Sequence, residues 1–421
     1  MDTCGIIAEY NPLHRGHQQQ LSNIRNKMGR ETGIVVCMTG PFCQQGVPAL
    51  LDKGIRTKLA LRAGADLVLE LPQAFATDSA ERFAEGAVAT LLATGVVRSL
   101  AYGTEYPDKA DTIQALGNFF VEESVDFVKA LKEELASGQG YAAARATASA
   151  RWIKNAEILL QSPNTILAVE YEKALRRLSE GDILPTIALP LIDKETCSSR
   201  KIRAIIDRQF DTRNGILLPE IYFPLFNELL PVLPPFSSSA IMHAAIEGRG
   251  LVTTSLLARY TLLSPLLRDL DRLLTIRGMH GGLAERIINL LANKDIKQSK
   301  YLHSADYTPA QIIATRSFPT SRVRRALLSV ALNIRSDDVA LTDEKPRYIR
   351  VLGFSKKGRR LLSFMRHTST LPVITIASQF HNLDSDIARR QAQLDLYAQS
   401  LWNALAGLNA ADEIERIPII I

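Results

Sequence analysis

Short apolar stretches alternate with helical patterns through the first part of this chain. Residues 3–9 (TCGIIAE), 33–40 (GIVVCMTG) and 65–72 (ADLVLELP) are β-branched or apolar and lie close to glycine or proline, as buried strands do. The segments between them, GHQQQLSNIRNKM and LDKGIRTKLALRAG, have helical periodicity. This alternation predicts βαβ units and therefore an α/β fold, in which helices cover both faces of a parallel sheet.

The remaining chain divides at a proline-rich stretch. Before it, RSLAYGTE and ILPTIALPL read as two more strands around a long helical region, from about 110 to 180. The stretch PVLPPFSSSA (231–240) is the clearest boundary, and mostly helical patterns follow it. YIRVLGFSKKG and LPVITIASQF then add strand character. We predict a catalytic domain at 1–230 and a basic, mostly helical RNA-binding region with a small mixed α/β element at 231–421.

Composition favours a globular cytoplasmic protein. The chain has 421 residues, more than one hydrophobic core usually organises. No apolar run approaches the roughly 18–20 residues that span a bilayer, and the N-terminus enters a strand pattern without a signal-peptide pattern. The cysteines are scattered, with no CxxC pair, so we expect free thiols and no metal site. They are Cys4, Cys37, Cys43 and Cys197.

Positive charge is concentrated late in the chain. The formal net charge is +6, but residues 316–366 alone hold thirteen Lys or Arg against four Asp or Glu. Such a stretch can be a solvated charged face. Because Tyr348, Phe354 and Phe364 are interleaved with the basic residues, we favour a surface that contacts the phosphates of nucleic acid.

The motif His14-Arg15-Gly16-His17 carries the predicted chemistry. It follows the first strand and Asn11-Pro12, at the expected start of a helix. Histidines three apart share one helix face, and the N–H groups of a helix N-terminus bind phosphate. Such a pair can stabilise charge on a triphosphate while a nucleophile attacks the α-phosphorus. The alternatives are a metal-site fragment or two chance surface histidines, but the position after the first strand favours nucleotide chemistry.

Several motifs have counterparts in a known family. GIIAEYNPLHRGH carries the HxGH signature of the adenylyl-transferring superfamily that includes class I aminoacyl-tRNA synthetases. The wider combination resembles the bacterial tRNA(Met) cytidine acetate ligase family over residues 3 to about 400. The matching segments are MTGPFCQQGVPALLDKGIRTKLAL, GADLVLELP, YGTE, SPNTILAVEY and YIRVLGFSKKG.

This resemblance implies a Rossmann-like HxGH nucleotidyltransferase domain and a specific reaction. ATP, with Mg²⁺ on its phosphates, activates acetate as acetyl-adenylate. The acetyl group then passes to N4 of the wobble cytidine, position 34, of elongator tRNA(Met), giving N4-acetylcytidine. DNA and membranes are not expected partners.

The resemblance also implies site residues. His14 and His17 would be catalytic. The implied ATP contacts come from the first loop, from later strand ends and from SSRKIR, the counterpart of the superfamily's second signature. They are Ile7, Ala8, Glu9, Tyr10, Asn11, Pro12, His14, Gly16, His17, Gln20, Gly103, Asn164, Ser198, Ser199 and Arg203. The serines of SSRKIR can also be a plain helix N-cap.

The sequence departs from the family at one position. Leu189 stands where the family usually carries an arginine. Either Lys194, Arg200 or Lys201 substitutes for it, or the nucleotide is held less firmly.

Three basic segments are candidates for RNA contact: LLDKGIRTKLALRAG, FPTSRVRRALLSVALNI and YIRVLGFSKKG. Each can also be a solvated charged face, but the resemblance and the local charge favour phosphate contact. The predicted contacts are Lys53, Arg56, Lys58, Arg322, Arg325, Lys356 and Lys357.

Two other functions remain open from the sequence. A small-metabolite adenylyltransferase would share HxGH, but it would leave the long basic second half without a role. A non-catalytic RNA-binding protein on a nucleotide-binding fold is the other alternative.

Overall fold

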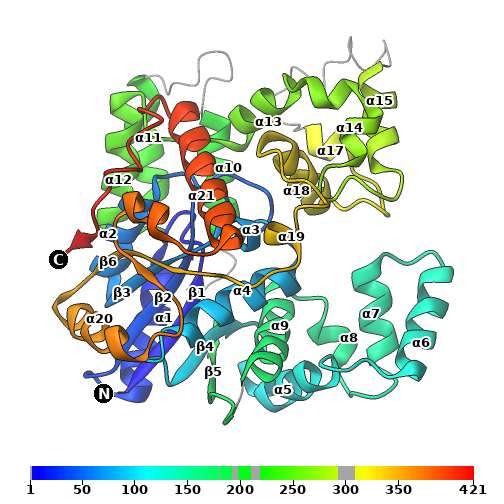
Figure 1. The fold of residues 1–421 in the computed structure, drawn as a ribbon, viewed down its shortest axis with the longest axis horizontal. Helices are drawn as coiled ribbons and strands as arrows, with labels where there is room; N and C mark the ends of the chain where they lie inside the picture. Colours follow the sequence, from blue (N-terminus) through cyan, green and yellow to red (C-terminus); the bar gives the residue numbers. More distant parts are fainter. Residues whose placement is uncertain (1, 180, 192–197, 210–218, 293–308) are drawn as a thin grey trace.

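The computed structural model describes residues 2–179, 181–191, 198–209, 219–292 and 309–421. Within them, one mixed sheet has the strand order β5-β4-β1-β2-β3-β6-β7, with β8 paired to β6 (Figure 1). The strands are β1 (Thr3–Ala8), β2 (Gly33–Thr39), β3 (Leu67–Leu71), β4 (Ser99–Thr104), β5 (Thr186–Pro190), β6 (Ile349–Phe354), β7 (Val373–Ile374) and β8 (Ile419–Ile420). The strands β1 to β5 are mutually parallel, and β6 joins β3 in the antiparallel sense.

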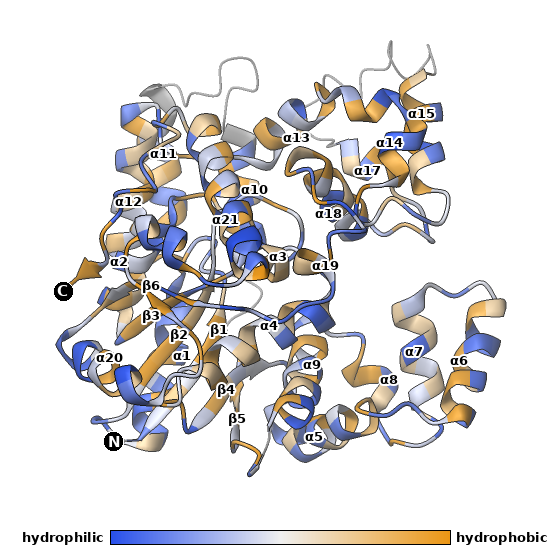
Figure 2. Ribbon diagram, viewed as in Figure 1, coloured by the Kyte–Doolittle hydropathy of each residue, from blue (hydrophilic) through white to orange (hydrophobic). Residues whose placement is uncertain are grey.

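Helices cover both faces of this sheet, because alternate residues of the strands are apolar on each face. Val35 and Cys37 pack into one core, whereas Ile34 and Val36 pack into the other. The first face is covered by α3 (Gln73–Ala76), α4 (Ala80–Ala93), α5 (Ala110–Phe119), α9 (Pro163–Leu178), α20 (Lys356–Thr368) and α21 (Asp386–Leu405). The second face is covered by α1 (Arg15–Met28), α2 (Lys53–Ala63), α10 (Ser199–Gln209), α11 (Pro219–Leu229) and α12 (Pro235–Glu247). Figure 2 shows the central strands as the hydrophobic interior between these layers.

Two helical groups lie beside the sheet domain. One extends from α9 and consists of α6 (Val125–Ala136), α7 (Tyr141–Ser149) and α8 (Ala156–Leu159) (Figure 1). The other has a separate small core. It contains α13 (Thr254–Leu262), α14 (Leu270–Leu274), α15 (Leu283–Ala292), α17 (Pro309–Ile313) and α18 (Thr320–Ala331), and α19 (Val339–Thr342) leads back to the sheet.

The predicted α/β fold with a parallel sheet and a mostly helical second half is confirmed. The structure adds that the late strands β6, β7 and β8 extend the N-terminal sheet. The proline-rich stretch is not a free linker, because Pro235 begins α12 and Leu233 is buried. The division at residue 230 stays a prediction. Of the predicted free thiols, Cys4, Cys37 and Cys43 are buried and free, and Cys197 lies outside the described residues.

Candidate active site at the carboxyl ends of the strands

The turn between β1 and α1 carries the HRGH motif. Ile7 and Ala8 are the last two residues of β1, and α1 begins at Arg15 with His14 as its N-cap residue. Since β1 lies between β4 and β2, this turn is in the middle of the carboxyl edge of the parallel strands. Ligands of open α/β sheets bind at this edge.

The two histidines contact one another directly. The rings of His14 and His17 are stacked with their centroids 3.7 Å apart, and the ring of Tyr10 lies edge-on to His17 at 5.0 Å. The backbone N–H of His14 donates to Nδ1 of His17 at 3.3 Å, so neutral His17 carries its proton on Nε2. Burial lowers the pKa of His14 to about 4, and burial together with His14 lowers the pKa of His17 well below its usual value. Both rings are therefore neutral near pH 7, and each keeps one N–H to donate.

Gly16 supplies a further donor at the start of α1. The N–H of Arg15 is bonded to Val232, and the N–H of His17 is bonded to the carbonyl of His14. The N–H of Gly16 donates no hydrogen bond within the described part of the chain. A free N–H in the first turn of a helix, at the positive end of its dipole, attracts phosphate.

The SSRKIR segment lies against the first motif. Oγ of Ser199 donates to the carbonyl oxygen of Pro12 at 3.2 Å, and Nη1 of Arg203 donates to that of Asn11 at 2.6 Å. Ser198 caps α10, since its Oγ accepts from the N–H three residues further along. The structure thus brings the two predicted signatures together.

Strand β4 and helix α9 border the other side of the turn. A Cβ on Gly103 would lie 2.7 Å from the side chain of Leu191 and 3.5 Å from Nε2 of Gln20, so these three residues are neighbours. Nδ2 of Asn164 donates to Oε1 of Glu105 at 3.0 Å. The predicted contacts Gly103, Gln20 and Asn164 therefore all lie near the carboxyl end of β4.

The loop after β2 closes over the turn through two hydrogen-bonded residues. Asn11, which is 1% exposed, donates from its side chain to the carbonyl of Pro48 and accepts from the N–H of Leu50. The N–H of Gln44 donates to Oε1 of Glu9 at 2.8 Å. The side chain of Asn11 is thus occupied in holding the loop, and its carbonyl oxygen accepts the hydrogen bond from Arg203. Sequence reasoning missed Gln44, whose only signal is its place after a strand end.

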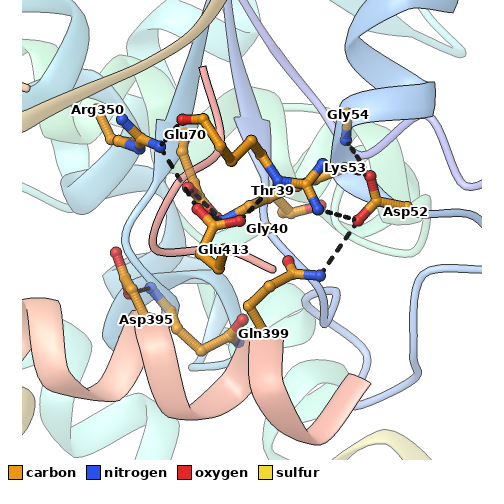
Figure 3. Close-up of polar contacts among 12 residues, drawn as sticks. Thr39, Gly40, Asp52, Lys53, Gly54, Glu70, Arg350, Asp395, Gln399 and Glu413 are labelled. Atoms are coloured by element: carbon orange, nitrogen blue, oxygen red, sulfur yellow. Dashed lines mark hydrogen bonds and ion pairs between the residues drawn. The ribbon is translucent and has the colours of Figure 1, made fainter. Parts of the chain in front are cut away.

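Lys53, predicted to contact RNA, lies in a buried ionic network. Its ammonium group is 2.8 Å from Glu70 and 2.9 Å from Glu413, and its side chain is 1% exposed (Figure 3). Arg350 is also buried beside Glu413. The C-terminal segment that carries Glu413 covers what reads in the sequence as a basic helix face.

Arg56, also predicted to contact RNA, is fully buried. It donates to the carbonyl oxygens of Leu51, Glu9 and Thr39 at 2.8–3.1 Å, and also to that of Gly40. It therefore ties together the carboxyl ends of β1 and β2. A side chain at 0% exposure has no surface to offer RNA, so the position of Arg56, like that of Lys53, does not fit RNA contact.

The other predicted RNA contacts lie at or near the surface. Lys58 and Lys356 are exposed, and Arg322, Arg325 and Lys357 are partly exposed. Arg322 and Lys357 donate to backbone carbonyls at 3.1 and 3.0 Å. Contact with RNA by these five residues stays a prediction.

Arg324 is a basic residue near the site that the predictions left out. Burial, and then the positive charge on Arg203 and Arg200, lower the pKa of Arg324, and the charge on Asp207 opposes them. A Cβ on Gly46 would lie 2.6 Å from the backbone of Arg324, so the loop after β2 packs tightly on α18. Helix α18 of the second half thus reaches the site.

Leu189, which stands where the family usually carries an arginine, is a core residue. It is 4% exposed on β5, opposite Gly103, and packs in the core. Arg200 and Lys201 are exposed on α10, and Lys194 lies outside the described residues. Substitution of the arginine by one of these basic residues, or weaker binding of the nucleotide, stays a prediction.

A cavity of about 580 Å³ lies along the side of α1. Gly16 lines it, but neither histidine does. We therefore locate the site by the convergent side chains described above. Among the described residues, no group of three or more His, Cys, Asp or Glu could hold a metal ion, and no helix is long and apolar enough to span a membrane.

Stacked histidines at a helix N-terminus, beside a second basic signature at the carboxyl edge of a parallel sheet, define a nucleotidyltransferase site. In agreement, the family described as HIGH Nucleotidyl Transferase matches residues 1–415. The chain is 32% identical over 416 residues to tRNA(Met) cytidine acetate ligase of Acetivibrio thermocellus, covering 96% of this chain and 94% of the relative. It is 31% identical to the enzyme of the same name from Thermotoga maritima, covering 94% of each. The chain belongs to the tRNA(Met) cytidine acetate ligase family.

A solved structure is similar over the whole chain. It is Thermotoga maritima TmcAL bound with alpha-thio ATP, with a TM-score of 0.82, 28% identity and full coverage of both chains. The apo form of that protein gives a TM-score of 0.83.

Proposed function

We propose that this protein is an ATP-dependent ligase that activates acetate as acetyl-adenylate and acetylates N4 of cytidine 34 of elongator tRNA(Met). The observation that carries the proposal is the stacked pair His14 and His17 at the N-terminus of α1, in a chain of this family. A cytoplasmic location fits the proposed tRNA substrate.

In the first step, a carboxylate oxygen of acetate attacks the α-phosphorus of ATP, and pyrophosphate leaves. The N–H of Gly16 and the free N–H of each histidine donate to the phosphate oxygens on which charge develops. Arg203 adds positive charge beside the turn, where it is bonded to Asn11. The neighbourhood of Gly103, Gln20 and Asn164 is the proposed place for the rest of the nucleotide.

Mg²⁺ fits this site as a companion of ATP. The described residues hold no cluster of carboxylates and histidines that could bind it alone. Mg²⁺ commonly keeps several waters and binds through substrate phosphates, where it neutralises the charge of the leaving pyrophosphate.

In the second step, the exocyclic amine of the cytidine attacks the acetyl carbonyl, and AMP leaves. The cytidine must be unstacked to reach the carboxyl edge of the sheet. Arg322, Arg324 and Arg325 lie on α18, which packs on the loop over the site, and we propose that this helix contacts the tRNA backbone.

The test is an incubation of the protein with ATP, Mg²⁺ and radiolabelled acetate, with and without tRNA. Label on tRNA that needs ATP, and that acetyl-CoA cannot supply instead, supports the ligase. Unlabelled tRNA with ATP turnover on a small phosphorylated metabolite would support a metabolite adenylyltransferase. No ATP turnover of any kind would leave a non-catalytic RNA-binding protein.

A further inference from the structure

Glu9 lies at the centre of the edge where the reaction is proposed to occur. It directly follows β1, which pairs with β2 on one side and β4 on the other. The adjacent Tyr10 contacts the ring of His17, so Glu9 is in the same turn as the histidine pair.

The carboxylate of Glu9 is held at one oxygen. Oε1 accepts from the N–H of Gln44 at 2.8 Å, and the carbonyl of Glu9 accepts from Arg56 at 2.8 Å. Gln44 is itself fixed, because its side chain donates to the carbonyl of Asp78. Oε2 accepts no hydrogen bond from the described part of the chain, and Glu9 is partly exposed. One oxygen is therefore anchored while the other is free to receive a donor.

Titratable groups surround Glu9 from four elements. They are Arg56 of α2, Arg203 of α10, Cys43 of the loop after β2 and Tyr171 of α9. Burial raises the pKa of Glu9 above the usual value for glutamate, and the Gln44 N–H and the two arginines act against that rise. Such a carboxylate is a stronger base than one in water.

We propose, resting on the function above, that Glu9 is the base of the acetyl-transfer step. Oε2 accepts a hydrogen bond from the exocyclic amine of the cytidine, as carboxylates do with cytosine N4. As N4 attacks, the C–N bond forms and the bond from the acetyl carbon to the AMP oxygen breaks. AMP leaves with that electron pair, and the proton lost by N4 moves to Glu9.

Two carboxylates at the neighbouring strand ends are already occupied. Glu105 accepts from Asn164 at one oxygen and from Thr165 at the other. Glu70 is paired with Lys53 in the buried network. Of these, only Glu9 has an oxygen left for a ligand.

The test is Glu9→Gln, measured in the two half-reactions separately. The variant keeps the shape and a hydrogen-bond acceptor but cannot take a proton. Because Glu9 is also one of the predicted ATP contacts, acetyl-adenylate formation from ATP and labelled acetate, without tRNA, is expected to fall far less than the transfer step. The single-turnover rate of transfer to tRNA should fall about 100-fold or more, and its dependence on pH in the acid range should flatten. Glu9→Asp should restore part of the transfer.

Glu122→Gln is the matched control, because it makes the same change at an exposed carboxylate outside the site. It should leave both half-reaction rates unchanged. The proposal is overturned if Glu9→Gln transfers acetyl at the wild-type rate, or if it loses both half-reactions equally. If wild-type protein labels no tRNA, the proposed function itself has failed, whatever the variant does.

Discussion

At the scale of single residues, the histidine pair decides what the turn can do. The hydrogen bond from the His14 N–H fixes the tautomer of His17, and stacking fixes the orientation of both rings. Both rings are ready to donate without reorganising, which is the condition for strong stabilisation of developing charge.

Replacing His17 with alanine should therefore lower kcat more than it changes the KM for ATP. The loss of one such donor is expected to cost about 100- to 1,000-fold in kcat. The labelled-acetate assay measures it, with Gln19→Ala, exposed on the same helix, as the control. An unchanged kcat in His17→Ala would remove the histidine from the mechanism.

The neutral state of His14 also predicts how stability depends on pH. Its pKa is about 4 in the folded chain against an ordinary value of 6.5, so the unfolded chain binds more protons between these values. The free energy of unfolding should then rise with pH across this window, by up to about 3 kcal/mol, and this gain is lost as the pH falls. Urea unfolding of His14→Gln between pH 4 and 7 should show a flatter dependence. His243→Gln, at an exposed position, should follow the wild type.

At the scale of elements, helix α2 links the C-terminal segment to the site. Arg416 pairs with both oxygens of Asp52, the N-cap residue of α2. Gln399 of α21 donates to the same carboxylate (Figure 3). Further along α2, Arg56 holds the ends of β1 and β2. Through α2, the C-terminal segment thus helps to hold the ends of β1 and β2, where the histidine turn begins.

Lys53→Met should destabilise the fold strongly, because it leaves Glu70 and Glu413 buried without their shared cation. Breaking a buried pair in this way costs about 3–5 kcal/mol. Lys58→Met, at an exposed position of the same helix, should change the free energy of unfolding by about 0.5 kcal/mol or less. Urea denaturation compares the two variants. Equal effects would show that the buried network contributes little.

At the scale of the whole molecule, the basic residues divide into buried and accessible sets. The buried set contains Lys53, Arg56 and Arg350. The number of basic residues in the sequence is therefore larger than the number that can contact RNA. Helix α18 and the exposed lysines remain as the accessible set.

Lys58→Gln and Lys356→Gln should weaken tRNA binding, and each should reduce the slope of log K against log salt concentration by about 1. Filter binding over a range of salt measures the slope. Val339→Gln, at an exposed uncharged position, is the control. A slope that neither lysine alters would place the tRNA on another surface.

Sequence patterns alone predicted the alternation of strands and helices, the HRGH turn at the end of β1 and the family. These features depend on residues a few positions apart, whose spacing sets strand and helix periodicity and helix capping. The same local logic placed His14, Gly16 and His17 at a helix N-terminus, where the structure has them.

Which charges are buried, and which strands complete the sheet, can be read only from the folded chain. Asp52 and Arg416 are 364 positions apart, and β3 pairs with β6 so that Glu70 lies opposite Arg350. No local pattern distinguishes a buried lysine from an exposed one on a basic helix, because the difference comes from the segment that packs over it. Likewise, only the folded structure shows that Oε1 of Glu9 is bonded to the N–H of Gln44 in the loop after β2, which leaves Oε2 for a ligand.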